Sequence, residues 1–535
     1  MDGRDTLPGE DASLWMATTN RTDFPALDRD RHVDTAVVGG GIAGVTAALH
    51  AAESGQSVVL LERDRIVEGV TGKTTAKVTA QHGLIYDDLL DKHGRDAARQ
   101  YARANEAAIE EIAERVEAHD IECGFERLPA YTYAADEDQR AAVGREATVA
   151  EGLDLPAEFV ADPPFPDDAS GAVKFADQAQ FHPRKYLLAL ADEIPREEAN
   201  VFEETKVTAV DDGGRNDPCR VETDRGTVTA ESVLLTTHFP IEDPALYFAR
   251  QYPKRSYVLA VELAAEAPRG LFYRDQSPYF SARPASPTDS GGDESSGGDE
   301  PSDGDESSGG WDADGPMMLV GGQNHKTGQG GSTADRYRRL ERQARDHFDV
   351  EEVRYRWSTQ DYVSVDRMPF VGELGPTTHG VYVATGFGGW GMTNGTAAGR
   401  MLAAYARDET PRWGDAFAPE RFDPAAGGEE FLKENLDAGA AFARDWVTAP
   451  FRDAHPVVAP GEGEVVRRGG DQLAVARDDE GELHVSSAVC PHLDCIVRWN
   501  DAEESWDCPC HGSRFALDGE VLDGPAVEDL PTRGE

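Results

Sequence analysis

The chain has 535 residues, of which 100 are acidic and 52 basic, so its formal net charge is −48. This charge excludes nucleic acid as a partner, because the phosphate backbone would be repelled. With 39% hydrophobic residues and no apolar run long enough for a bilayer, the sequence predicts two or three folded domains, no membrane span and a cytoplasmic location. The acidic residues are spread along the whole chain, which favours adaptation to the molar salt of a halophilic cell.

The first strong pattern is a strand, a glycine turn, a helix and a second strand. Residues 33–38 are apolar, GGGIAG follows at residues 39–44, an alanine-rich helix is expected to about residue 54, and a strand covers residues 57–61. This order is the dinucleotide-binding fingerprint in its full context.

Each polar or glycine position of this pattern has an expected role. Gly39 permits the tight turn, Gly41 lets the backbone approach a pyrophosphate, and Gly44 allows the helix to pack closely on the strand. Glu62, directly after the second strand, is expected to accept hydrogen bonds from the adenosine ribose. The amides at the helix N-terminus favour the phosphates.

Four later segments carry a family resemblance. They are TGKTTAK at residues 71–77, QHG at residues 81–83, YVSVDRMPFVG at residues 362–372 and TGFGGWGMTNG at residues 385–395. Together with the glycine turn they resemble the superfamily of D-amino-acid oxidase and glycine oxidase. No second glycine fingerprint stands between a strand and a helix, so a nicotinamide domain is not expected.

The resemblance implies FAD as cofactor and a set of residues around it. Besides Gly39, Gly41, Gly44 and Glu62, the implied FAD-binding residues are Thr74, Thr75, Val207, Gly386, Gly391, Met392 and Thr393. It also implies the fold class: an α/β FAD-binding Rossmann-type domain with an α+β substrate subdomain, here followed by an all-β module.

Composition divides the remainder of the chain. Residues 1–32 are an N-terminal extension, residues 33–420 form the flavin domain, residues 421–454 form a helical linker, and residues 455–535 form the last domain. Residues 281–310 are rich in Ser, Gly, Asp and Glu and predict a disordered acidic loop.

The sharpest motif lies near the C-terminus. Cys490 and His492 are followed, after fifteen residues, by Cys508 and His511. Two loops that each supply one thiolate and one imidazole suit a Rieske 2Fe-2S cluster, in which one iron has two Cys ligands and the other has two His ligands. A structural zinc site is the alternative, but zinc spacings do not predict the two additional cysteines in these loops.

CPHLDC and CPCHGSRF resemble the high-potential Rieske proteins. That resemblance implies a disulfide between Cys495 and Cys510, a hydrogen bond from Ser513 to a cluster sulfide, and a covering loop at residues 524–526. Phe515 stands where the family often has a tyrosine. The missing hydroxyl predicts a potential below that of the quinol-oxidising members.

The flavin superfamily oxidises C–N bonds, so the resemblance implies a small amine or amino-acid-like substrate. A flavin accepts electrons in pairs and a Rieske cluster accepts them singly, which predicts transfer between the two and an external acceptor or donor. Candidate catalytic residues are Lys73, His82 and His325. An electron-transfer or redox-sensing protein without a small substrate is the alternative; a ring oxygenase is disfavoured because no clear iron triad is present.

Overall fold

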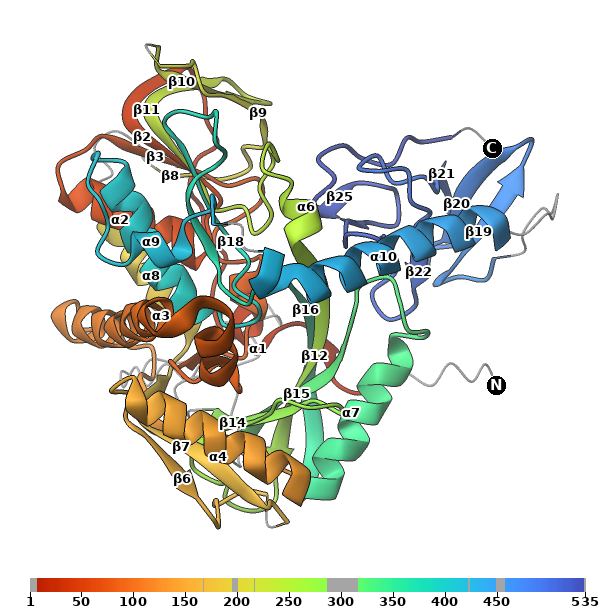
Figure 1. The fold of residues 1–535 in the computed structure, drawn as a ribbon. Coiled ribbons are helices and arrows are strands. Elements are labelled where there is room, and N and C mark those ends of the chain that lie inside the picture. Colours follow the sequence, from red (N-terminus) through yellow and green to blue (C-terminus); the bar gives the residue numbers. More distant parts are fainter. Residues whose placement is uncertain are drawn as a thin grey trace, which may run out of the picture.

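The computed structural model describes residues 7–166, 168–194, 201–215, 217–285, 316–421, 424–448 and 458–533. It consists of a large module built on two sheets, a long helix, and a C-terminal module of small sheets (Figure 1). Among the described residues, no helix combines the length and the apolar character that a bilayer crossing requires.

The first sheet is eight-stranded and its central strands are parallel. Its order is β17 (Phe370–Glu373), β18 (Val381–Thr385), β11 (Thr227–Leu235), β2 (Arg31–Val38), β3 (Val58–Leu61) and β8 (Val201–Phe202), with β10 (Cys219–Thr223) and β9 (Val207–Asp211) attached at β11. All four residues of β3 are buried, as expected for a parallel strand that is covered on both faces. The helices α2 (Ile42–Glu53) and α8 (Gly391–Tyr405) pack against each other on this sheet.

The second sheet is ten-stranded and mainly antiparallel. Its order is β1 (Glu10–Asp11), β16 (Val350–Ser364), β12 (Gln251–Leu263), β15 (Met317–His325), β14 (Phe280–Ala285), β13 (Leu271–Arg274), β5 (Glu126–Ala134), β7 (Gly171–Gln180) and β4 (Lys77–Val78), with β6 (Ala157–Val160) beside β7. The helices α4 (Glu137–Gly152) and α7 (Ala334–His347) pack on it.

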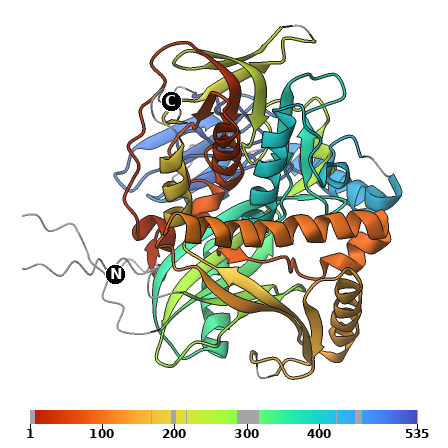
Figure 2. The same cartoon turned by 90° about the vertical axis from the view of Figure 1, so that its left-hand side faces the viewer.

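A long helical segment lies between the parts built on these sheets. It is α3 (Ile85–Ala118), which Figure 2 shows crossing the molecule; Gly94 interrupts its regular geometry with a φ of 79°. The short helices are α1 (Leu14–Ala17), η1 (Val70–Lys73), α6 (Tyr247–Arg250) and α9 (Gly414–Phe417), and α5 (Pro183–Glu193) packs near α2.

The C-terminal module contains two small antiparallel sheets. One consists of β19 (Glu462–Arg468), β20 (Asp471–Arg477) and β21 (Leu483–Ser487), and the other of β22 (Arg498–Asn500), β23 (Ser505–Asp507), β24 (Arg514–Phe515) and β25 (Val521–Asp523). Helix α10 (Pro424–Thr448) runs from the large module to this one (Figure 1). The predicted α/β architecture with a C-terminal all-β module is confirmed.

The structure corrects the expected acidic loop at its beginning. Residues 281–285 belong to strand β14 and pair with β15, because their polar side chains have buried partners: Lys77 donates to Ser281 at 3.1 Å, and Arg283 donates to Gln180 at 3.0 Å. The composition alone did not show these partners. Residues 286–310 of the expected loop lie outside the described residues.

Candidate functional site

The glycine turn after β2 has the close contacts that exclude larger residues. Gly39 has a φ of +103°, in the region that favours glycine. A Cβ on Gly44 would lie 1.9 Å from the carbonyl oxygen of Gly39, so only glycine lets α2 approach the turn. Helix α2 begins at Ile42, directly after the turn, and the amide of Ile42 donates to the hydroxyl of Thr71 at 3.1 Å. A helix N-terminus favours a phosphate.

Glu62 lies at the end of β3, beside this turn. One of its carboxylate oxygens accepts a hydrogen bond from the amide of Gly40 at 2.7 Å, and the other from the amide of Asp64 at 3.0 Å. Burial raises the pKa of Glu62. The two amides orient the carboxylate, and each oxygen retains a lone pair for a ribose hydroxyl.

A cavity of about 590 Å³ extends from the glycine turn to the loop that precedes α8. Of the residues expected at FAD, those lining it are Gly39, Gly41, Glu62, Thr74, Thr75, Val207, Gly386, Gly391 and Met392. Gly44 instead packs behind the turn, and the hydroxyl of Thr393 donates to the carbonyl of Thr79 at 2.9 Å. The glycine cradle, the helix N-terminus and the carboxylate at the far strand together fit an adenine dinucleotide.

The two cysteine–histidine loops of the C-terminal module lie side by side. The thiols of Cys490 and Cys508 are hydrogen-bonded to each other, and that bond lowers the pKa of Cys490. The sulfur of Cys490 also accepts from the amide of His492 and from Ser513. Preformed donors around a thiolate are what a cluster-binding loop requires, so the residues fit a 2Fe-2S cluster.

The two histidine rings of these loops lie next to each other. The centroids of His492 and His511 are 5.1 Å apart and the rings are nearly perpendicular. The buried Nδ1 of His511 has no partner among the described residues. Burial lowers the pKa of His492 to about 4 and that of His511 to about 3, which keeps both imidazoles in the neutral form that binds iron.

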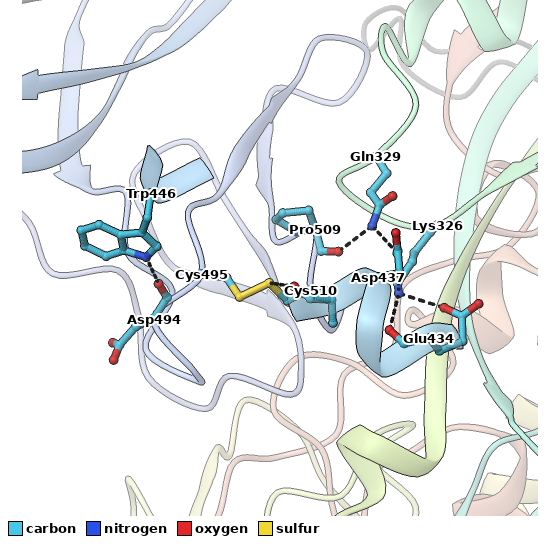
Figure 3. The surroundings of a disulfide bond; sticks show 10 residues. Lys326, Gln329, Glu434, Asp437, Trp446, Asp494, Cys495, Pro509 and Cys510 are labelled. Atoms are coloured by element: carbon cyan, nitrogen blue, oxygen red, sulfur yellow. Dashed lines mark hydrogen bonds and ion pairs between the residues drawn. A yellow bond between two sulfur atoms is a disulfide. The ribbon is translucent and has the colours of Figure 1, made fainter. Parts of the chain in front are cut away.

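A disulfide joins Cys495 and Cys510 of these loops. Figure 3 shows it next to helix α10, whose carbonyl at Ala438 lies 3.6 Å from the sulfur of Cys510. Gln329 donates to the carbonyl of Pro509 at 3.0 Å and to the carboxylate of Asp437 on α10 at 2.9 Å (Figure 3). The second ligand loop is therefore attached to both the linker helix and the large module.

The C-terminal module forms part of the wall of the large cavity. Arg514 and residues 521–527 line it together with the glycine turn. Arg63 donates to the carbonyls of Val521 at 3.0 Å and Leu522 at 3.1 Å. The cluster loops and the FAD cavity are thus neighbours across one interface.

A second cavity of about 420 Å³ adjoins the first. Lys254, Tyr273, Tyr279, Phe387 and Trp390 line both cavities. Glu430, Lys433 and Glu434 of the linker helix α10 line the second cavity on another side. This arrangement places a polar and aromatic space next to the expected flavin.

The catalytic candidates Lys73, His82 and His325 do not meet at one point. Lys73 lines the first cavity, where burial lowers its pKa. His82 and His325 line the second. The ring nitrogens of His82 contact the hydroxyl of Tyr101 and, at 2.7 Å, the carbonyl of Thr79, and burial lowers its pKa to about 3. Its hydrogen bonds suit a positioning role.

Three other polar residues that could have faced substrate have different surroundings. Gln323 bonds the side chains of Gln343 and Arg339, and Lys326 bonds Glu434 and Asp437 of α10, so both have structural partners. Tyr279 lies at both cavities, with the ammonium of Lys254 4.9 Å from its ring centre.

The sequence interpretation missed Lys254 and Arg367, two cations that line the second cavity. Lysine is rare here, with nine in the chain, and Lys73, Lys77, Lys254 and Lys326 all lie at or beside the cavities. That scarcity was an available signal. Arg367 lies in the segment at residues 362–372, but its position at the cavity depends on the turn after β16.

The sequence pattern of the FAD dependent oxidoreductase family (DAO) matches residues 34–405, and that of the Rieske [2Fe-2S] domain matches residues 451–533. The large cavity, the two cysteine–histidine loops and these two sequence matches together define a flavin- and iron–sulfur-dependent oxidoreductase. The chain belongs to the FAD-dependent oxidoreductase family and carries a C-terminal Rieske domain, so its cofactors are FAD and a 2Fe-2S cluster.

Three known proteins illustrate this relationship. YhfW of Bacillus subtilis strain 168, named as a Rieske 2Fe-2S iron-sulfur protein, is 35% identical over 522 residues. The match covers 97% of this chain and 96% of YhfW. Gamma-glutamylputrescine oxidoreductase of Escherichia coli K12 is 26% identical over 462 residues, or 81% and 97% of the two chains. The glycine oxidase structure from Geobacillus kaustophilus superposes with a TM-score of 0.55 at 19% identity, covering 74% of this chain and 100% of its own, which indicates a shared fold.

Proposed function

We propose that this flavoenzyme oxidises a small amine or amino-acid-like substrate and that electrons pass between its flavin and its Rieske cluster. The observation that carries the proposal is the position of the C-terminal module. Arg514 and residues 521–527 of that module line the same cavity as the glycine turn, so the module that carries the proposed cluster loops closes part of the flavin cavity.

The second cavity supports an amino-acid-like substrate. It lies beside the flavin loop at Gly386 and contains Lys254 and Arg367. Within the described part of the chain, no hydrogen bond or ion pair reaches the ammonium of Lys254; its contact is the ring of Tyr279. The Nε of Arg367 lies 3.7 Å from a carboxylate oxygen of Asp88. Asp275, which also lines this cavity, acts electrostatically on both cations, and a substrate carboxylate would add a charge-assisted partner for them.

The neighbouring groups can hold the remainder of such a substrate. Tyr273, Tyr279 and Trp390 supply aromatic walls that orient a carbon chain, and Trp390 stacks on His82 at 4.9 Å between ring centres. Bound FAD supplies the chemistry, which is acceptance of a hydride from the carbon attached to nitrogen. The protein positions that carbon, neutralises the carboxylate and excludes water around the reacting bond.

The test is anaerobic incubation of the protein, containing FAD and cluster, with a panel of amino acids and amines. Flavin absorbance and the Rieske EPR signal are followed together. A substrate should bleach the flavin and then reduce the cluster. If no compound bleaches the flavin but a reduced protein partner does, the enzyme proposal is wrong and the electron-transfer alternative replaces it.

Substitution of Lys254 tests the carboxylate site. Lys254→Met should raise KM for an amino-acid substrate by about 10- to 100-fold, which corresponds to the loss of one charge-assisted hydrogen bond. KM for the corresponding amine should not change. Lys174→Met, which changes a lysine that lines neither cavity, is the control and should leave both KM values unchanged. Equal KM changes for acid and amine would contradict a carboxylate contact.

We also propose Cys490, His492, Cys508 and His511 as the cluster ligands. His511→Ala should abolish the Rieske EPR signal while the FAD content per chain is retained. A variant with an unchanged EPR signal would contradict this ligand set.

We further propose that the net charge of −48 adapts the surface to molar salt. The melting temperature should therefore rise steadily between 0.1 and 3 M KCl; a maximum at low salt would contradict the adaptation.

A further inference from the structure

The side chain of Tyr362 spans from the large module to the cluster loops. Tyr362 lies near the end of β16, is 2% exposed and lines the FAD cavity. Its hydroxyl donates to the carbonyl oxygen of Gly524 at 2.6 Å and lies 3.4 Å from the carbonyl oxygen of His511. The same hydroxyl thus contacts the loop at residues 524–526, which is expected to cover the cluster, and the backbone of a proposed cluster ligand.

The backbone of Tyr362 reaches the flavin side of the cavity. Its carbonyl oxygen accepts a hydrogen bond from the amide of Gly388 at 2.9 Å, and residues 386–392 line the cavity. A continuous series of covalent and hydrogen bonds therefore leads from this glycine loop through Tyr362 to His511. Aromatic contacts with His238 and Phe239, at 4.9 and 5.0 Å between ring centres, hold the ring in place.

Phe248 of α6 covers the imidazole edge of the cluster site. Its ring centre lies 5.4 Å from that of His492 and 5.2 Å from that of His511, edge to face in both cases. In this arrangement the histidine edge faces the large module of the same chain.

We propose that Tyr362 is a positioning residue for electron transfer, connecting the FAD cavity to His511, and that Phe248 closes the histidine edge to other proteins. The inference rests on the proposed function. Oxidation of one substrate molecule supplies two electrons, the cluster accepts one at a time, and an external one-electron acceptor removes each in turn. The path is used twice per turnover, Tyr362 itself is not oxidised, and the protons released leave to solvent.

Gln360 provides contacts between the two modules that do not depend on the hydroxyl of Tyr362. Its side-chain amide donates to the carbonyl of Gly512 at 2.8 Å and to Asp523 at 3.0 Å. Asp523 also lies 3.3 Å from His238. These contacts do not involve the hydroxyl of Tyr362, so they remain in Tyr362→Phe. That variant removes the contacts of the hydroxyl with Gly524 and His511 and the hydrogen bond that Gln360 donates to it at 3.3 Å.

The experiment compares wild-type protein, Tyr362→Phe and Tyr86→Phe, all with both cofactors bound. Tyr86 is a matched control, because its buried hydroxyl donates to the carbonyl of Ala80 at 2.7 Å away from both cavities. The flavin is photoreduced under anaerobic conditions, and the growth of the cluster EPR signal gives the transfer rate. The cluster midpoint potential and the EPR g-values are measured on the same samples.

Tyr362→Phe should slow electron transfer from the flavin to the cluster by about three- to tenfold, because one hydrogen bond along the path is lost. The g-values of the cluster should not change. Tyr86→Phe should transfer at the wild-type rate. A wild-type rate in Tyr362→Phe would overturn the inference and leave the proposed function standing. A wild-type protein whose reduced flavin never reduces the cluster would overturn the proposed function itself.

Phe248→Ala supplies an independent measurement. Reduced cluster in this variant should react severalfold faster with ferricyanide than in wild-type protein, because the histidine edge becomes accessible. Phe442 of α10 is 40% exposed, and Phe442→Ala should react at the wild-type rate. Equal ferricyanide rates for Phe248→Ala and wild-type protein would overturn the closing role of Phe248.

Discussion

Glu503 of the C-terminal module compensates a buried cation of the large module, and its neutralisation should weaken the contact between them. Arg255 is 1% exposed and donates to Glu503. Arg514 donates to the same carboxylate at 2.6 Å, and Ser358 donates to its other oxygen. Burial alone would raise the pKa of Glu503, but the two arginines outweigh it and hold that pKa well below its usual range.

The expected cost of Glu503→Gln follows from these contacts. Removing one partner of a buried ion pair costs about 3–5 kcal/mol, because the other charge stays buried without compensation. Glutamine keeps one acceptor and the Glu503 side chain is 17% exposed, so the lower end, about 3 kcal/mol, is expected. Because the native pKa is depressed, this stabilisation is present above the unfolded pKa and is lost as the pH falls below it.

The assay is urea unfolding at pH 7, with cluster absorbance reporting the C-terminal module and flavin fluorescence reporting the large module. Glu520→Gln, on an exposed turn, is the control. The loss should persist in 1 M KCl, since a buried pair is screened much less than a surface pair. A loss below about 0.5 kcal/mol, or one that disappears in high salt as for a surface ion pair, would refute the reasoning.

Three further predictions concern other parts of the chain. Cys495→Ser opens a loop of 15 residues and should cost the C-terminal module about 3 kcal/mol; dithiothreitol should speed cluster loss in wild-type protein but not in the variant. Gly44→Ala should lower the FAD content per chain, because the added Cβ overpacks the turn at a cost of about 1–3 kcal/mol. Gly428 has open space around it, so Gly428→Ala should keep full FAD content. Burial raises the pKa of Glu146 from 4.5 to about 7, so the contribution of this carboxyl group to stability is lost as the pH rises through this range. Glu146→Gln should remove about 3 kcal/mol of this change in the free energy of unfolding, measured between pH 5 and pH 8. An unchanged dependence on pH would contradict the prediction.

The sequence alone was sufficient where the chemistry is local. The turn at Gly39 to Gly44 needs glycine because of its own backbone geometry, and adjacent strands and helix complete the dinucleotide fingerprint within about thirty residues. The proposed cluster ligands likewise lie on two short loops, Cys490 to His492 and Cys508 to His511. Such features are readable because every interacting group is near in the chain.

The tertiary structure decided everything that depends on distant partners. Lys254 lies near the start of β12 and Arg367 just after the end of β16, and the antiparallel pairing of these strands brings both to the same end and into one cavity. No spacing in the sequence predicts that meeting. Strand β14 extends into the expected acidic loop because Arg283 finds a buried partner on β7. The position of the cluster loops against Tyr362 and Phe248 results from packing between modules. Such contacts depend on complementary surfaces more than a hundred residues apart, and a single sequence does not record them.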